Sequence, residues 1–189
     1  MRLVLLRHGR TEANERRLYC GASDLCLSAA GQAELKALRA RVRYPEAECL
    51  LRVSSGMRRA DETMALLFGA EPEARVPDLR EMNFGRFELH SYEELKADAD
   101  YQAWICDGSG AVSTPGGESS AEFRARVFAA ADALDRDALV VCHGGVIAAL
   151  MARWFPGEQR NMYQWQPGFG LGYVVELEAD GRRFYPVNP

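Results

Sequence analysis

The chain has 189 residues, of which 48% are hydrophobic and 26% are charged, and its formal net charge at pH 7 is −4. This composition is ordinary for a globular protein with one sizeable core, so we predict a single domain over residues 1–189. The negative charge argues against nucleic acid or an anionic membrane surface as a partner. No apolar run approaches the roughly 20 residues that a membrane-spanning helix needs.

The cysteine pattern bears on the cellular compartment. The five cysteines form neither CxxC pairs nor an even set. They are Cys20, Cys26, Cys49, Cys106 and Cys142. This pattern favours free thiols in a reducing compartment over a disulfide framework or a zinc site. Because the sequence begins directly on a predicted strand, without a charged-then-apolar leader, we expect a cytoplasmic protein.

The predicted elements begin with an alternation of strand and helix. Residues 2–7 include four consecutive apolar residues and predict a buried strand, and Thr11 or Asn14 can cap the short helical turn after it. Ser28 then begins a helix whose apolar residues recur at helical spacing. These residues are Ala30, Ala33, Ala37, Leu38 and Val42. A second strand is predicted over 49–53 and a second helix over 57–68.

An irregular region over 76–89 precedes the second half of the alternation. The remaining predicted elements are helices over 91–96, 100–106 and 118–134, a strand over 139–142, a helix over 146–155, and a hairpin of 172–177 and 183–187 split by Asp180-Gly181. Strands that alternate with helices predict a three-layer α/β/α fold with a mostly parallel central sheet and the hairpin at its edge. Ligands of such folds bind at the carboxyl ends of the strands.

Two of the three histidines directly follow predicted strands, at the carboxyl ends where ligands are expected. His8 ends the run LVLLRHG, and His143 ends the run LVVCHGG. Arg7 would be an unfavourable core residue without a partner, whereas at a strand tip its guanidinium can bind an anion. Cationic neighbours disfavour a protonated imidazole and keep His8 neutral. A neutral imidazole in an anion site can attack phosphorus, although the tripeptide Arg-His-Gly alone fits a structural role equally well.

Two other segments carry groups that suit phosphate chemistry. Arg58 and Arg59 lie at a predicted strand-to-helix junction, where free backbone N–H groups and the helix dipole favour anions. Glu81 lies in the irregular region and can deliver a proton to a leaving oxygen.

Five motifs, taken together and in this order, resemble the histidine phosphatase superfamily in its phosphoglycerate mutase-like branch. They are LRHGxTxxN at 6–14, SSxxxRAxxT at 54–63, ExxFG from Glu81, PGGES at 115–119 and VxHGG at 141–145. The resemblance covers nearly the whole chain and implies a phosphoglycerate mutase-like fold.

The resemblance also implies a role for each candidate catalytic residue. His8 is the nucleophile that becomes phosphohistidine. Arg7, Arg59 and a protonated His143 hold the phosphoryl oxygens. Glu81 acts first as general acid and then as general base. The reaction requires no metal and no other cofactor, and its partners are a small phosphorylated substrate and inorganic phosphate.

Further contacts follow from the same resemblance. Asn14 is expected to contact phosphate, and the backbone of Cys20 and Gly21 is expected to line the substrate pocket. The arginine that directly precedes the alanine of SSxxxRA is Arg59, so Arg58 is assigned to the surface or to the substrate rim.

Phosphatases and mutases of this family share the same machinery. The mutases carry extra segments over the site, so a length of 189 residues favours a hydrolase. Among the hydrolases, segments 79–88, 101–104 and 114–119 resemble the α-ribazole phosphatases of cobalamin nucleotide-loop assembly. That group usually has Trp where Phe87 stands, and many relatives have Gly where Leu89 stands. We predict a metal-independent phosphomonoesterase acting on α-ribazole 5′-phosphate or a similar small sugar phosphate.

Three alternatives stay open at this point. The chain could be a cofactor-dependent phosphoglycerate mutase, a non-catalytic module that binds a phosphorylated ligand, or a phosphatase acting on phosphoprotein. The presence of all five catalytic residues argues against the non-catalytic module. The oligomeric state is not predicted.

The remaining reactive or aromatic residues are expected to be structural. His90 is assigned to solvent and Cys142 to a buried thiol. The helix over 118–134, with Arg124 and Arg126, is expected to cover the sheet. Core positions are expected for Trp104, Met151, Trp154, Met162 and Trp165.

Overall fold

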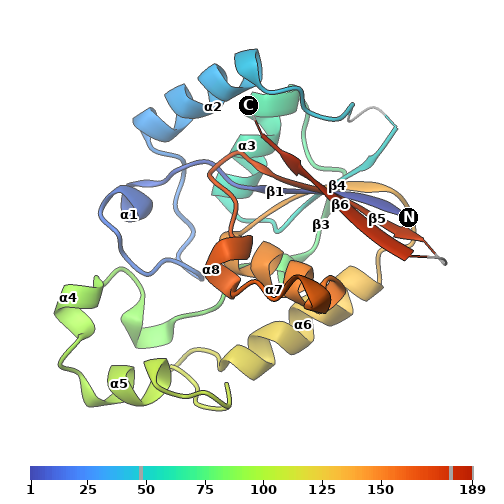
Figure 1. The fold of residues 1–189 in the computed structure, drawn as a ribbon. Coiled ribbons are helices and arrows are strands. Elements are labelled where there is room, and N and C mark those ends of the chain that lie inside the picture. The colour runs from blue at the N-terminus through green and yellow to red at the C-terminus, as the bar shows by residue number, and fades with distance from the viewer. Residues whose placement is uncertain (47–48, 179–180, 189) are drawn as a thin grey trace.

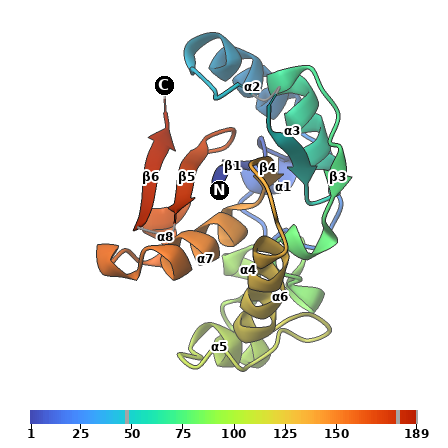
Figure 2. The ribbon, with the colours of Figure 1, turned by 90° about the vertical axis from the view of Figure 1, so that its right-hand side faces the viewer.

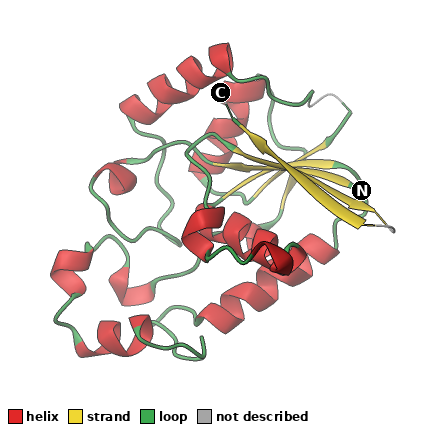
Figure 3. Ribbon diagram, viewed as in Figure 1, coloured by secondary structure: helices red, strands yellow, loops and turns green. Residues whose placement is uncertain are grey.

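The computed structural model describes residues 1–46, 49–178 and 181–188, and one six-stranded sheet runs through them (Figures 1 and 3). The strands are β1 (Arg2–Arg7), β2 (Leu51–Ser54), β3 (Ala74–Arg75), β4 (Ala138–Cys142), β5 (Gly172–Glu178) and β6 (Gly181–Val187). Their order is β3-β2-β4-β1-β5-β6. The first four of these are mutually parallel, whereas β5 is antiparallel to β1 and β6 to β5. The predicted mostly parallel sheet with an edge hairpin is confirmed; Asp180 lies outside the described residues.

Helices cover both faces of this sheet, and further helices form a lobe beside it. They are α1 (Glu12–Glu15), α2 (Ala29–Arg41), α3 (Arg58–Phe68), α4 (Tyr92–Leu95), α5 (Ala99–Ile105), α6 (Ser120–Asp132), α7 (Gly144–Trp154) and α8 (Met162–Trp165). Helices α2 and α3 lie on one face and α6 and α7 on the other, while α4 and α5 form a small lobe beside α6 (Figures 1 and 2). This arrangement is the predicted three-layer α/β/α fold. None of the described helices is both long and apolar enough to cross a membrane.

Alternate residues of β1 enter two separate cores, because successive side chains of a strand point to opposite faces of the sheet. Leu3 and Leu5 pack in the core under α6 and α7, and Val4 and Leu6 pack in the core under α2 and α3. All four are buried. A strand covered on both faces is apolar throughout, which is why a continuous apolar run predicted it.

The buried face of α2 differs from the predicted one. Three of the predicted core alanines are exposed: Ala30, Ala33 and Ala37. Leu38 and Val42 are buried as predicted, and the helix also buries Gly31 and Leu35, which were not predicted. Leucine side chains bury more apolar area than alanines and therefore decide the face. Gly31 also lets the helix approach the end of β1, since a Cβ there would lie 2.1 Å from the carbonyl oxygen of Arg10.

Other differences concern short elements and one side chain. Strand β3 and helix α8 were not predicted, and the irregular region contains the 3-10 turns η1 (Pro77–Leu79) and η2 (Gly85–Phe87). Elements of two to four residues are too short for a periodic pattern to reveal. Met162, expected in the core, is exposed, whereas Met151, Trp154 and Trp165 are buried as predicted.

Candidate active site

The two predicted His-Gly segments meet where the parallel strands β1 and β4 end. Arg7 is opposite Cys142 in the strand register, and the His8 N–H donates to the Cys142 carbonyl oxygen at 2.9 Å. The rings of His8 and His143 lie with their centroids 5.0 Å apart. Both histidines are buried. The parallel topology therefore brings together two imidazoles that are 135 positions apart in the sequence (8 to 143).

The hydrogen bonds of His8 define its nucleophilic atom. Its Nδ1 lies 2.6 Å from the Gly9 carbonyl oxygen. Since a carbonyl can only accept, Nδ1 carries the proton and Nε2 carries the lone pair. Burial lowers the pKa of His8 well below 6.5, and the charges of Arg59 and Arg7 lower it further. The cationic neighbours thus act as the sequence predicted, but burial is the larger cause of the neutral state.

Arg59 is a fully buried cation. Its Nη1 donates to the Ser23 carbonyl oxygen and its Nη2 to that of Gly21, each at 2.7 Å. The charge of Arg59 lowers the pKa of both His8 and His143, which places it beside the two imidazoles. Two carbonyl oxygens do not neutralise a buried guanidinium, so this position favours an anion.

The neighbouring residues explain why Arg59, and not Arg58, occupies the site. Arg58 is exposed and lies 3.8 Å from Glu62, one turn along α3. The Thr63 hydroxyl donates to the Arg59 carbonyl oxygen at 2.6 Å and accepts from the Gly9 N–H at 2.8 Å. The threonine of the SSxxxRAxxT motif therefore ties α3 to the residue after His8.

Arg7 is held by a segment that sequence reasoning missed. Its Nη1 donates to the Pro167 carbonyl oxygen at 2.9 Å, and its guanidinium carbon lies 4.0 Å from the centroid of the Phe169 ring. The Arg10 guanidinium carbon lies 4.9 Å from the same centroid. A cation over an aromatic face is an attractive contact. The Pro-Gly-Phe-Gly sequence at 167–170 predicts a turn but carries no sign that the turn packs on Arg7.

His143 is buried beside Ser55 and is affected by the charge of Arg59. Its Nε2 is hydrogen-bonded to the Ser55 Oγ at 2.8 Å. Burial, followed by the charge of Arg59, lowers the pKa of His143 well below 6.5. Burial therefore favours a neutral His143, whereas the predicted protonated form concerns the site with a phosphoryl group bound and stays a prediction. A phosphate dianion beside it would raise the pKa again.

Buried polar nitrogens without hydrogen-bond partners gather in this site. Three buried side-chain nitrogens lack a hydrogen-bond partner among the described residues, namely Arg7 Nε, Arg59 Nε and His143 Nδ1. Buried polar atoms without partners are unfavourable and are rare in folded proteins. Because no other buried side-chain nitrogen or oxygen of the described chain lacks a partner, their grouping indicates a site for a ligand with several acceptor oxygens.

Glu81 lies at the N-terminus of α7, next to His143. Its Oε2 accepts from the Gly145 N–H at 2.8 Å, and its Oε1 accepts from the Met82 N–H at 3.0 Å. A Cβ at Gly145 would lie 2.3 Å from Glu81 Oε1. Glycine at this position therefore makes room for the carboxylate at the N-terminus of α7.

The loop that carries Glu81 is held by Arg126, which was assigned only to a covering helix. Arg126 donates to the carbonyl oxygens of Asp78 and Arg80 at 2.9 Å each and to that of Glu81 at 3.0 Å. Its Nε donates to Glu118 Oε1 at 2.6 Å. The covering helix thus also fixes the backbone of the candidate acid.

The backbone of Gly21 supports Arg59, while the predicted substrate contact of Cys20 and Gly21 stays a prediction. The Gly21 N–H donates to the Glu88 carboxylate at 3.0 Å, and its carbonyl oxygen accepts from Arg59. The Cys20 Sγ lies 3.7 Å from the Ser23 carbonyl oxygen. Both backbone groups of Gly21 therefore already have partners within the protein.

Three other assignments can be placed in the structure. Asn14 Oδ1 accepts from the Thr11 N–H and hydroxyl, each at 3.0 Å, which closes the capping box of α1. His90 is exposed and lies outside the site. Cys142 is buried, and burial raises the pKa of its thiol to about 12. The thiol is therefore protonated and unreactive at neutral pH.

An apolar pocket of about 590 Å³ begins at Glu81 and Gly145. Most of its lining is aromatic and aliphatic and comes from the Glu81 loop, α5, α6, α7 and α8. The aromatic lining residues are Tyr19, Phe84, Trp104, Phe123, Phe128 and Tyr163. Ile105, Met162 and Tyr163 are exposed at its edge. Of its two arginines, Arg153 is already paired with Asp132 at 2.8 Å.

The two positions that depart from the α-ribazole phosphatase pattern have different surroundings. Phe87 is fully buried with Leu95 and Tyr101 in the α4–α5 lobe. Leu89 has φ 60° and is 44% exposed. This left-handed backbone is the conformation that glycine adopts most readily, so the expected glycine would fit this position without strain. Neither residue lines the apolar pocket.

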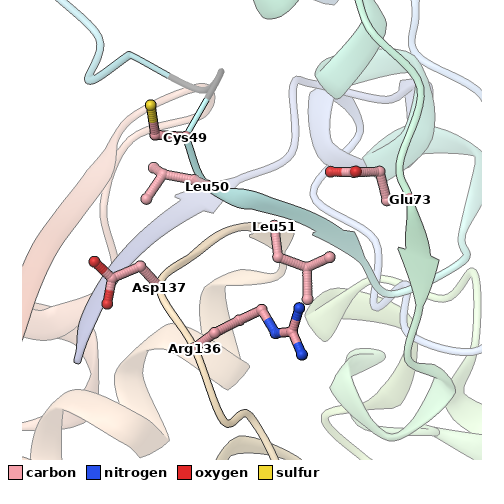
Figure 4. A pocket seen from close by; sticks show the side chains of 6 residues that line it. All are labelled: Cys49, Leu50, Leu51, Glu73, Arg136 and Asp137. Carbon is pink, nitrogen blue, oxygen red and sulfur yellow. The ribbon is translucent and has the colours of Figure 1, made fainter.

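A second hollow, of about 370 Å³, lies at the opposite end of the parallel strands from the candidate site (Figure 4). Cys49, Leu50, Leu51, Glu73, Arg136 and Asp137 line it. It adjoins the amino ends of β2 and β4, whereas ligands of parallel sheets bind at the carboxyl ends. The Asp137 carboxylate already accepts from the Arg2 N–H at 2.7 Å. This hollow is therefore not a candidate active site.

We predict that acid destabilises the protein through its two buried histidines. Their folded-state pKa values lie below 6.5, so below about pH 6.5 the unfolded chain binds protons that the folded chain does not. The free energy of unfolding should therefore fall as the pH falls, by up to about 1.4 kcal/mol per pH unit for each histidine. Urea unfolding at about pH 7 and about pH 5.5 measures this slope. His143→Gln should make it shallower, and an unchanged slope in that variant would contradict the assignment.

Known proteins are similar to this chain in both sequence and fold. The sequence matches the profile of the histidine phosphatase superfamily (branch 1) over residues 3–188. The adenosylcobalamin/alpha-ribazole phosphatase of Salmonella typhimurium is 36% identical over 186 residues, which cover 94% of this chain and 91% of that protein. A probable phosphoglycerate mutase of Yersinia enterocolitica is 28% identical, covering 95% and 93%. The alpha-ribazole phosphatase structure from Shigella flexneri has a TM-score of 0.84 at 27% identity, covering 100% and 96%. The chain belongs to branch 1 of the histidine phosphatase superfamily.

Proposed function

We propose that this protein is a metal-independent phosphomonoesterase that works through a phosphohistidine on His8. One observation carries the proposal: the residues with unpartnered buried nitrogens, Arg7, Arg59 and His143, are neighbours of a buried imidazole whose pKa is lowered. Phosphoryl oxygens supply the acceptors that these donors lack, and fixed donors of this kind stabilise the charge of a phosphoryl group in transfer.

The first half of the proposed reaction transfers the phosphoryl group. His8 Nε2 attacks phosphorus in line with the ester oxygen, so that an N–P bond forms as the P–O bond breaks. Glu81 gives its proton to the departing oxygen, and the product alcohol leaves. The guanidinium groups of Arg7 and Arg59 hold the equatorial oxygens, and His143 contributes its free Nδ1.

The second half regenerates the enzyme with water. The Glu81 carboxylate takes a proton from a water molecule, whose oxygen attacks phosphorus as the N–P bond breaks. Inorganic phosphate leaves, and His8 returns to its neutral form. Glu81 is protonated again and ready for the next ester.

The apolar pocket favours α-ribazole 5′-phosphate as the substrate. The pocket starts at Glu81, where the leaving alcohol must lie, and its walls are mainly aromatic and aliphatic. α-Ribazole carries a flat bicyclic base that can be buried in such a pocket. The carboxylate of 3-phosphoglycerate would lose hydration there and find few cationic partners. Chain length does not distinguish a phosphatase from a phosphoglycerate mutase, because the alignment with the probable phosphoglycerate mutase of Yersinia enterocolitica covers 93% of that protein.

The test is a comparison of kcat/KM for α-ribazole 5′-phosphate, 3-phosphoglycerate and a panel of sugar phosphates without added metal. We expect hydrolysis of all these esters to some degree, with the highest kcat/KM for α-ribazole 5′-phosphate. Mutase activity that depends on 2,3-bisphosphoglycerate would favour the mutase instead. Binding of inorganic phosphate without turnover of any ester would favour a non-catalytic module.

Trp104→Ala should weaken the preference for the bulky substrate. Trp104 lines the pocket, and its ring centroid lies 6.0 Å from that of Phe84. Loss of one aromatic stacking partner should raise KM for α-ribazole 5′-phosphate about tenfold or more, with little change for glycerol 3-phosphate. Trp104→Phe should retain most of the preference. Tyr185→Ala, at an exposed position of β6, is the control. An equal loss on both substrates would contradict a role of the pocket in specificity.

A further inference from the structure

We propose that Glu88 is a positioning residue that holds Arg59 in its phosphate-binding geometry through the loop of residues 21–23. The inference rests on the proposed role of Arg59 as a phosphate ligand. It assigns a function to a carboxylate that makes no contact with the catalytic residues themselves and that the mechanism above does not use.

The Glu88 carboxylate accepts hydrogen bonds from four backbone N–H groups that converge on it. Gly21 donates to both carboxylate oxygens at 3.0 and 3.1 Å. Ala22 donates to Oε1 at 2.9 Å, and Ser23 donates to Oε2 at 3.1 Å. Phe84 adds a fourth N–H at 3.0 Å. Successive N–H groups that converge in this way form an anion-binding concavity, and here a side chain of the protein occupies it.

The same loop presents its carbonyl oxygens to Arg59. Gly21 and Ser23 each accept from one terminal nitrogen of the guanidinium at 2.7 Å. Gly21 and Ser23 therefore have their N–H groups on Glu88 and their C=O groups on Arg59. The loop is a bridge between a carboxylate on one side and a guanidinium on the other.

Packing against the Glu81 loop limits the freedom of this bridge. A Cβ at Gly21 would lie 1.6 Å from the Met82 carbonyl oxygen and 3.1 Å from Glu88 Oε1. The Phe84 N–H bond to Glu88 lies within the segment that carries Glu81 and holds the Glu88 carboxylate against that segment. Glu88 thus fixes the segment that holds Arg59 relative to the segment that carries Glu81.

Without the Glu88 carboxylate, three N–H groups of the 21–23 loop and that of Phe84 lose their acceptor. A glutamine at this position can offer one carbonyl oxygen, but its amide nitrogen then faces N–H donors. The loop should reorient to find other acceptors, and the two carbonyl oxygens should move with it. Arg59 would keep its charge but lose its fixed direction, so the defect should appear as weak phosphate binding.

The experiment measures binding of inorganic phosphate by calorimetry in Glu88→Gln and Glu88→Asp. We expect the Kd of Glu88→Gln to rise about ten- to a hundredfold, the range that one charge-assisted hydrogen bond supplies. Glu88→Asp, which keeps the charge, should rise less. Glu94→Gln is the matched control, because Glu94 also accepts a backbone N–H, from Ser91, but is exposed in α4. Its Kd should equal that of the wild type.

A double variant separates positioning from general stability. If Glu88 acts through Arg59, Glu88→Gln should add little in the background of Arg59→Lys. A Kd for Glu88→Gln within twofold of the wild type, or losses that multiply in the double variant, would overturn the proposal. If Glu88→Gln does not fold, an unchanged Kd in Glu88→Asp would do the same. Because phosphate binding needs no turnover, failure of the proposed enzymatic function shows separately, in the activity of the wild type.

Discussion

His8→Ala should abolish hydrolysis of every phosphomonoester, including activated aryl esters. The imidazole Nε2 is the only protein atom in the proposed reaction that bonds to phosphorus, and Arg7, Arg59 and His143 can only hold the group. Loss of an enzyme's nucleophile lowers kcat by about 10⁵- to 10⁶-fold. The variant should still bind inorganic phosphate, because all three candidate phosphate ligands are retained.

The measurement is kcat on α-ribazole 5′-phosphate and on p-nitrophenyl phosphate, with circular dichroism to check the fold. His90→Ala is the matched control, because His90 is the third histidine and is exposed away from the site. It should keep the kinetics of the wild type. Substantial turnover by His8→Ala on either ester would mean that water attacks phosphorus directly and that the mechanism is wrong.

Glu81→Gln should lower activity by an amount that depends on the leaving group. Glutamine has nearly the shape of glutamate but cannot give up a proton. For α-ribazole 5′-phosphate, whose alkoxide must be protonated as it leaves, kcat should fall by about 10²- to 10⁴-fold. In p-nitrophenyl phosphate the leaving group is a stable anion, so formation of the phosphohistidine should be slowed far less.

Single-turnover kinetics on the two esters separates the transfer step from the hydrolysis of the intermediate. Glu93→Gln, at an exposed position of α4, serves as the control. If Glu81→Gln slowed phosphoryl transfer from both esters equally, Glu81 would be acting on the phosphoryl group itself and not as the acid for the leaving oxygen.

The location of the site was predictable from sequence because two apolar runs stop at His-Gly. Strands that are buried on both faces must be apolar, and their carboxyl ends meet at one edge of a parallel sheet. These two facts bring His8 and His143 together without any knowledge of the fold family. The roles of His8, Glu81 and Arg59 came from the resemblance, since a strand tip alone does not distinguish a nucleophile from a phosphate ligand.

The residues that hold the site could not be predicted, and the reason is the same for each of them. Arg126 binds carbonyl oxygens of the loop that carries Glu81, and Arg7 binds the carbonyl oxygen of Pro167. Glu88 binds N–H groups of the 21–23 loop, whose carbonyl oxygens hold Arg59. Every residue other than proline has the same backbone groups, so such contacts leave no pattern of side-chain types in the sequence. They appear only when the path of an irregular loop is known.

The protonation state of His143 shows a related limit. The family resemblance implied a protonated His143 that holds phosphate. Its complete burial lowers its pKa well below 6.5. Desolvation is a property of the whole fold, and it outweighs the local motif in setting the pKa.

The most direct test of the account is to trap the covalent intermediate. Rapid quench of the wild-type protein with α-ribazole 5′-phosphate labelled in its phosphorus, followed by peptide mapping under alkaline conditions, locates the bound phosphoryl group. We predict an acid-labile label on His8, formed in a burst and missing from His8→Ala. Label on any other residue, or steady release of phosphate with no protein-bound label at any quench time, would contradict the claim that His8 is the nucleophile.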